Sequence, residues 1–146
     1  AGSSVRSSYY LGATVPTPIE GLKAGVAFDY LHVDNRAGVS SGNSSSLAGY
    51  LSLAATEKLT LHGRVDYIRV GGDGLVGAGN VLGAAFAPTD ELIATTLTAD
   101  YQLWKNVISR AEIRWDTDLD ENGGSHFRSG TDDNEFSLMA NIIYKF

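Results

Sequence analysis

Three side chains that could do chemistry together stand at alternate positions in the segment LHGRVDY (61–67). His62, Arg64 and Asp66 are two residues apart, so in an extended strand they project from the same side. A His–Asp pair could support hydrolysis if a nucleophile stood beside it. The sequence indicates no such nucleophile, and we therefore expect no catalytic residue and no enzyme activity.

A second segment, VISRAEIRW (107–115), repeats this spacing with Arg110, Glu112 and Arg114. Opposite charges that face each other across strands stabilise a sheet, so we expect the two segments to form a cross-strand ladder of ion pairs. Charged side chains in the wall of a pore also set the field through which ions pass. The predicted chemistry is therefore electrostatic.

The segment GDGLVG (72–77) satisfies the G-x-G-x-x-G pattern of dinucleotide sites and follows a predicted strand. The residues after it, AGNVLGAAFAPTD, contain more glycine and a proline, and they lack a helix with an acidic residue about twenty positions on. We interpret the segment as a surface loop and expect no cofactor.

Two patterns concern metals. DTDLDENGG (116–124) spaces its acids like a calcium loop, but an EF-hand needs Gly and Glu where this chain has Glu121 and Phe127. A surface cation site in this loop stays open beside a merely solvated loop. The three histidines, His32, His62 and His126, are scattered and cysteine is absent, so we expect no metal site of the zinc type.

The elements that would position these side chains are strands. Alternation with a period of two dominates the 146 residues, in seven segments of about the length that a tilted strand needs to cross a bilayer. The predicted strands are residues 5–15, 22–30, 47–55, 59–67, 93–101, 107–115 and 136–146. One phase of these segments contains no charged residue, and the other phase holds most of the charge.

We expect the charged phase to face a water-filled lumen and the apolar phase to face lipid. The predicted pore-lining residues are Lys23, Asp29, His62, Arg64, Asp66, Arg110, Glu112, Arg114 and Lys145. Aromatic residues gather near both ends of the apolar phase, as in the interfacial girdles of outer-membrane barrels. The predicted girdle residues are Tyr30, Tyr67, Tyr101, Trp115, Phe136 and Tyr144.

The predicted fold is a transmembrane antiparallel up-and-down β-barrel that occupies residues 1–146 as one domain. Short connections (16–21, 56–58 and 103–106) alternate with long polar ones (35–46, 68–92 and 116–134), which is the asymmetry of such barrels. With an odd number of strands, the start of the first strand and the end of the last strand lie on opposite sides of the membrane. We therefore expect the chain to be the C-terminal part of a larger barrel; the alternative is an eighth strand from another copy.

The charge balance excludes one class of partner and suggests a selectivity. A net charge of −6 with no basic stripe argues against nucleic acid. With Arg6 and Asp100, which share the charged phase, the predicted wall holds six basic and four acidic side chains, so we expect a slightly basic wall beneath acidic loops.

Three stretches resemble the C-terminal part of the OmpL-like β-barrel porins of Gram-negative bacteria: SLAATEKLTLHGRVDYIRV, LTADYQLWKNVISRAEIRWD and SLMANIIYKF. In that group a turn of the form x-T-[DE]-K-L precedes a strand ending in R-x-[DE]-Y. Here these are Thr56-Glu57-Lys58-Leu59 and Arg64-Val65-Asp66-Tyr67. Members of the group are considerably longer, which agrees with the expectation of missing upstream strands.

The resemblance implies a general diffusion porin of the cell outer membrane that passes small hydrophilic solutes and ions. It also implies that the last strand, with Tyr144 and Phe146, is the signal read by the barrel-assembly machinery. The implied partners are outer-membrane lipid, that machinery and the copies or other chains that complete the barrel.

Two other functions remain open. One is a non-conducting outer-membrane barrel with a structural, adhesion or loop-display role. The other is a soluble ligand-binding barrel, which would need an apolar lumen and a polar exterior, the inverse of the charge sorting found here.

Overall fold

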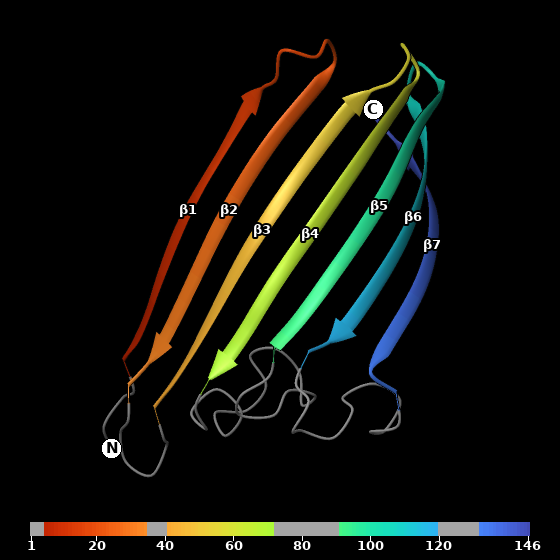
Figure 1. Ribbon diagram of the computed structural model, residues 1–146. Helices are drawn as coiled ribbons and strands as arrows, with labels where there is room; N and C mark the ends of the chain where they lie inside the picture. Colours follow the sequence, from red (N-terminus) through yellow and green to blue (C-terminus); the bar gives the residue numbers. More distant parts are fainter. Residues whose placement is uncertain (1–4, 35–40, 72–90, 120–131) are drawn as a thin grey trace.

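The computed structural model describes residues 5–34, 41–71, 91–119 and 132–146, and all regular structure in these ranges is strand. Neighbours in the chain pair antiparallel, so the sheet order is the chain order (Figure 1). This confirms the predicted all-β, up-and-down topology. The strands are β1 (Arg6–Pro16), β2 (Leu22–Val33), β3 (Gly42–Ala54), β4 (Leu59–Gly71), β5 (Glu91–Trp104), β6 (Val107–Asp118) and β7 (Asn134–Tyr144).

The register keeps the two phases of the sequence on two faces of the sheet. Leu47 of β3, for example, lies opposite Phe28 of β2 and Tyr67 of β4. Residues directly opposite each other in an antiparallel pair project to the same side. Because this matching continues through all six strand pairs, the apolar phase forms one continuous face.

The strands extend further than the alternation predicted. β3 begins at Gly42, β4 continues to Gly71 and β6 continues to Asp118, all within segments predicted to be loops. A strand needs only backbone partners, and the ladder supplies them here, as where Asn43 lies opposite Gly71. The end of the hydrophobic alternation therefore marks the end of the apolar band, not the end of the strand.

The three short connections, residues 17–21, 55–58 and 105–106, lie at one end of the sheet and are bonded to neighbouring strands. In the β3–β4 turn the hydroxyl of Thr56 accepts hydrogen bonds from the backbone N–H groups of Lys58 (3.2 Å) and Leu59 (2.9 Å). The carbonyl of Lys58 then accepts the N–H of Gln102 at 2.8 Å. The Thr-Glu-Lys-Leu motif is thus a side-chain-stabilised turn of the kind that threonine forms.

The β1–β2 turn is tied to the next turn through glycine. Gly21 has φ of 76°, a left-handed conformation that glycine adopts without strain. Its carbonyl accepts the N–H of Ala54 at 2.9 Å. A Cβ at position 21 would lie 3.0 Å from the carbonyl oxygen of Ala54, so a side chain there would press on this bond.

The other three connections (34–41, 72–90 and 119–133) join strand ends that all lie at the opposite end of the sheet, because the strands alternate in direction. They are longer than the connections at the first end, so the predicted asymmetry between short turns and long connections is present. The two ends are called the turn end and the long-connection end below.

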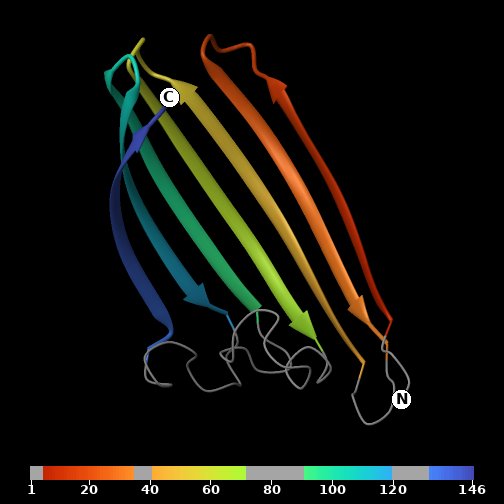
Figure 2. The same cartoon turned by 180° about the vertical axis from the view of Figure 1, so that it is seen from behind.

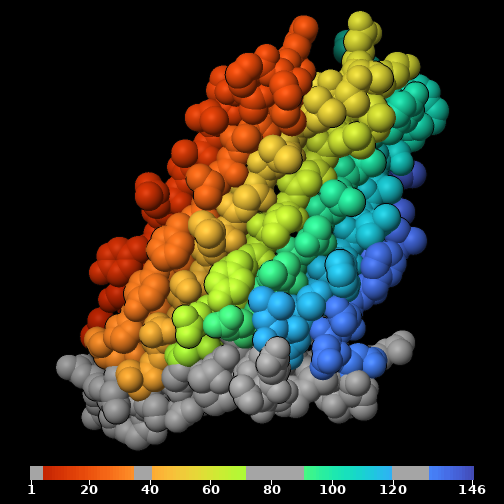
Figure 3. Space-filling view, in the orientation of Figure 1, coloured from red at the N-terminus to blue at the C-terminus, as the bar shows by residue number. Residues whose placement is uncertain are grey.

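The sheet is a single layer. The two opposite views show it tilted, twisted and curved (Figures 1 and 2), and no other described element lies over the face seen in the space-filling view (Figure 3). Within the described residues, β1 and β7 each pair on one side only, so the sheet is not closed. No described part of the chain is a helix long and apolar enough to cross a membrane.

Candidate functional site: the charged face of the sheet

The two faces differ sharply in exposure. On the apolar face the side chains point away from the protein even in the central strands, as shown by Leu51, Val65 and Leu97, which are 53%, 50% and 60% exposed. The buried apolar residues of the described chain all belong to the other phase: Ala27, Val33, Ala48, Val70, Leu92 and Ala94. Side chains crowd together on the concave side of a curved sheet, so we identify the charged phase as the inner face. The apolar outer face is far larger than the isolated patches of soluble proteins.

All nine residues predicted to line a pore belong to the inner phase. The register places Lys23, His62 and Glu112 along one cross-strand row, and Arg64 with Arg114 along the next. Asp66 and Asp29 follow in the rows nearer the long-connection end, and Arg110 lies nearer the turn end. Lys145 comes directly after β7.

The Arg64–Asp66 pair lies within β4. The Nε and Nη2 groups of Arg64 donate to the two carboxylate oxygens of Asp66 at 2.6 and 2.7 Å, a bidentate geometry that gives strong charge-assisted bonds. Asp66 is only 4% exposed, with Ala48 and Ala94 opposite it on the neighbouring strands. The guanidinium also lies over the ring of Tyr50, 5.2 Å from its centroid. The small alanines leave the space in which this pair packs.

The second pair crosses between strands. Arg110 of β6 lies directly opposite Asp100 of β5 and donates two bonds of 2.7 Å to its carboxylate. The Nε2 atom of His62 is 3.7 Å from the same carboxylate. Asp100 therefore connects β4, β5 and β6. The alternation of the sequence predicted this face for Asp100, although Asp100 was not among the nine residues named as pore-lining.

The third arginine again pairs within its own strand. Arg114 donates from Nε to both oxygens of Asp116 at 2.9 and 2.8 Å. Between the two arginines of β6, Glu112 accepts a hydrogen bond of 2.9 Å from the hydroxyl of Thr98. Each of the three arginines thus has an aspartate partner.

The predicted cross-strand ladder between the two charged segments is wrong. β5 separates β4 from β6, so Arg64 and Asp66 cannot reach Arg110, Glu112 or Arg114 as direct neighbours. The sequence pattern placed the segments on the same face, and the strand predicted at residues 93–101 already separates them in an up-and-down order.

The predicted basic excess of the wall is wrong as well. Because β6 and β7 extend further than expected, Asp116, Asp118 and Glu135 also lie in the inner phase. The described inner face therefore holds six basic residues (Arg6, Lys23, Arg64, Arg110, Arg114 and Lys145) and seven acidic ones (Asp29, Asp66, Asp100, Glu112, Asp116, Asp118 and Glu135). The wall is close to neutral and densely charged.

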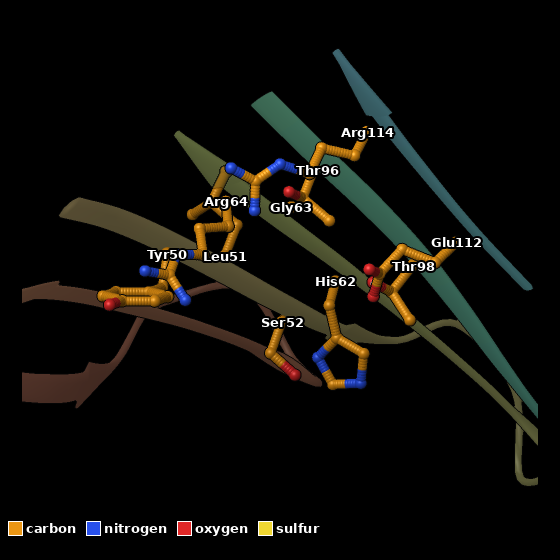
Figure 4. Close-up of a pocket in the computed structure, with 10 residues that line it drawn as sticks. All are labelled: Tyr50, Leu51, Ser52, His62, Gly63, Arg64, Thr96, Thr98, Glu112 and Arg114. Atoms are coloured by element: carbon orange, nitrogen blue, oxygen red, sulfur yellow. The ribbon is translucent and has the colours of Figure 1, made fainter. Parts of the chain in front are cut away.

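A hollow of about 290 Å³ lies in the middle of this face. Figure 4 shows Arg64 beside Tyr50, and shows His62 and Ser52 projecting toward the same space. The remaining polar lining is Thr96, Thr98, Glu112 and Arg114. Hydroxyl, imidazole, carboxylate and guanidinium groups can here replace water molecules around a polar solute.

The predicted girdle residues all lie on the apolar face. Tyr30 contacts Tyr9 of β1 with ring centroids 6.4 Å apart, and Trp115 lies opposite Phe136. These residues lie some positions before the ends of the extended strands. At the turn end, the rings of Tyr144 and Phe146 are 6.0 Å apart.

Trp104 is an aromatic of the apolar face that the alternation missed. A bulge between Gln102 and Trp104 shifts the phase by one residue, so Trp104 pairs with Val107 on the outer side and is 69% exposed. A strict period of two assigns it to the opposite face.

Three sequence motifs fall wholly or partly outside the described residues. These are GDGLVG (72–77), His126 and positions 120–124 of the acidic segment.

A family model described as "Putative beta-barrel porin-2, OmpL-like" matches residues 9–146, which is nearly the whole chain and includes β2 to β7 entirely. No curated protein and no solved structure matched the chain.

Proposed function

Because the chain belongs to the OmpL-like β-barrel porin family, we propose that it forms part of the wall of an outer-membrane pore. Small hydrophilic solutes and ions would pass through this pore by diffusion. The proposed passage involves no chemical step, and the side chains of the inner face would contact the solute without reacting with it.

One observation carries this proposal, namely the separation of charge between the two faces. Every strand has an outer phase free of charge over its central part, and the ionisable residues of that part lie on the inner face. A charge on the lipid face of a barrel costs about 2–4 kcal/mol near the bilayer midplane, so a lipid-facing surface excludes charge. A soluble sheet has no reason to expose its apolar side so completely.

The inner face also offers its charges to water. The side chains of Arg64, Arg114 and Arg110 are 51%, 45% and 37% exposed although each is paired. A paired but hydrated guanidinium can exchange water for an ion or a polar solute. This supports transient contact during passage more than tight binding.

A membrane location places one further demand on the sheet. The unpaired backbone groups of β1 and β7 have no hydrogen-bond partners in hydrocarbon, so each of the two edges must pair with another strand. In the proposed pore those strands come from the same protein or from another copy.

Reconstitution of the purified protein in planar lipid bilayers tests the proposal. We expect stepwise increases in conductance, and liposomes containing the protein should admit small sugars faster than large ones. Folded, inserted protein that gives no conductance steps would overturn the porin assignment and favour the loop-display role.

A matched pair of variants identifies the face that lines the pore. Ser52→Trp places a large side chain in the hollow of the inner face and should lower single-channel conductance. Leu53→Trp adds an aromatic side chain to the adjacent position on the outer face, away from the hollow, and should leave conductance unchanged. The opposite result would assign the lumen to the other face.

A further inference from the structure

We propose that the inner face carries an electric polarity along the strands, and that the pore therefore conducts ions more easily in one direction. The inference rests on the proposed function. The inner face is basic toward the turn end and acidic toward the long-connection end. The current through the pore should therefore depend on the sign of the applied voltage.

The order of charges along single strands is the first observation. In β2, Lys23 lies next to the turn end and Asp29 toward the long-connection end. In β7, Glu135 lies at the long-connection end and Lys145 follows the strand at the turn end. The strands β4 and β6 have the same order. The three described strands that carry both signs on the inner face thus share one polarity, and β7 agrees with them when Lys145 is included.

The geometry of the ion pairs is the second observation. The pairs Arg64–Asp66 and Arg114–Asp116 each lie within one strand, and in both the arginine is nearer the turn end. Their dipoles therefore point the same way. The third pair, Asp100–Arg110, joins directly opposed residues and adds little along the strands.

Some inner-face charges oppose this polarity. Arg6 lies at the long-connection end, and Asp100 and Glu112 lie in the half nearer the turn end. They are outnumbered, because the half nearer the turn end also holds Lys23, Lys145 and Arg110.

The described residues beyond the strands do not reverse the order. At the turn end, the two acids Glu20 and Glu57 are balanced by Lys58 and Lys105. At the other end, Asp34, Asp132 and Asp133 add to the acidic side.

The expected consequence is rectification with a defined sign. A positive potential on the long-connection side drives cations in through the acidic half and anions in through the basic half, so both ions accumulate and the current is large. The reverse potential depletes both. A potential of about 1 kT in each half changes ion concentrations roughly threefold, so we expect a current ratio of about two in 0.1 M salt, where the Debye length is about 10 Å.

The test needs pores of known orientation. Glu57→Cys, in the exposed β3–β4 turn, introduces a thiol into a chain that has no cysteine. Labelling this thiol from one side with an impermeant reagent shows which side of the bilayer holds the turn end. Current–voltage curves are then recorded from single oriented pores.

Variants that exchange two opposite charges, and so keep the net charge, test whether the order of charges causes the rectification. The double variant Lys23→Asp/Asp29→Lys reverses two charges about 20 Å apart along β2 and should bring the current ratio close to one. The double variant Arg114→Asp/Asp116→Arg should lower the ratio in the same sense. The control is Asp100→Arg/Arg110→Asp, which exchanges charges across strands and should keep the ratio of the parent protein.

The possible outcomes separate this inference from the proposed function. Conducting pores with a symmetric current, or a ratio that the β2 exchange leaves unchanged, would overturn the polarity and leave the porin assignment intact. An absence of conductance would instead overturn the porin assignment. A ratio that rises when the salt is lowered from 1 M to 0.1 M, as screening weakens, supports the polarity.

Discussion

The ion pair with Arg64 offsets the free-energy cost of burying the carboxylate of Asp66. Asp66 is almost fully buried, and the alanines that surround it provide no donors. A buried carboxylate without a partner costs far more free energy than an exposed one. Arg64 provides two donors while its own head stays half exposed.

Replacing Arg64 should therefore lower the free energy of unfolding more than replacing Arg114 does. We expect Arg64→Ala to lower the free energy of unfolding by about 2–3 kcal/mol, because it leaves Asp66 buried and unpaired. Arg114→Ala should cost about 1 kcal/mol, since Asp116 has a side chain that water reaches more easily. Urea titration of protein folded in lipid vesicles, followed by tryptophan fluorescence, measures both values. Equal losses would contradict the assigned role of burial.

For single residues, the sequence predicted on which face of the sheet a side chain lies better than it predicted the ion-pair partner of that side chain. The alternation placed the nine predicted pore-lining residues on one side, where the register also puts them. It could not pair Arg110 with Asp100, because that contact depends on which strands are neighbours and on their register. It missed Trp104 because a bulge changes the phase without any signal in the hydrophobic pattern.

At the scale of elements, the strands are longer than the apolar band that they carry. The segment NSSS (43–46) looks like a loop in the sequence, yet it continues β3 beside β4. Hydrophobic alternation reports only the surroundings of side chains, whereas backbone pairing continues as long as a neighbouring strand is present. The sequence therefore predicted the order of the seven strands in the described residues, and made several of them too short.

Adjacent residues of β5 provide the sharpest test of the two faces. Leu97→Arg places a charge in the middle of the apolar face and should destabilise the protein in lipid by about 2–4 kcal/mol. Thr96→Arg puts the same side chain on the inner face beside the hollow and should cost less than about 1 kcal/mol. Unfolding titrations in vesicles give both numbers. Equal tolerance of the two variants would show that the outer face does not contact lipid.

At the scale of the whole molecule, the last aromatic residues bear on assembly. Tyr144 and Phe146 lie in ring contact on the apolar face at the turn end, where the proposed assembly signal is located. We expect Phe146→Ala to fold in detergent like the parent protein, because its side chain is fully exposed and adds little packing.

In cells, the same variant should accumulate in the outer membrane at a clearly reduced level. Fractionation and quantitative blotting provide the measurement, and Phe136→Ala, on the same strand and face, is the control. Unchanged outer-membrane levels of the Phe146 variant would remove the assembly role from this residue.

The odd number of strands has a consequence for how the wall can close. β1 and β7 run in the same direction, since each of the six pairings between them reverses the chain. A direct seam between them would be a parallel ladder, with slanted and evenly spaced hydrogen bonds, inside an otherwise antiparallel sheet. An entirely antiparallel wall needs an odd number of inserted strands. A ring of two copies of the described sheet would hold fourteen strands. If β7 of each copy met β1 of the other, both seams would be parallel. Antiparallel seams would require β1 to meet β1 and β7 to meet β7 across a two-fold axis.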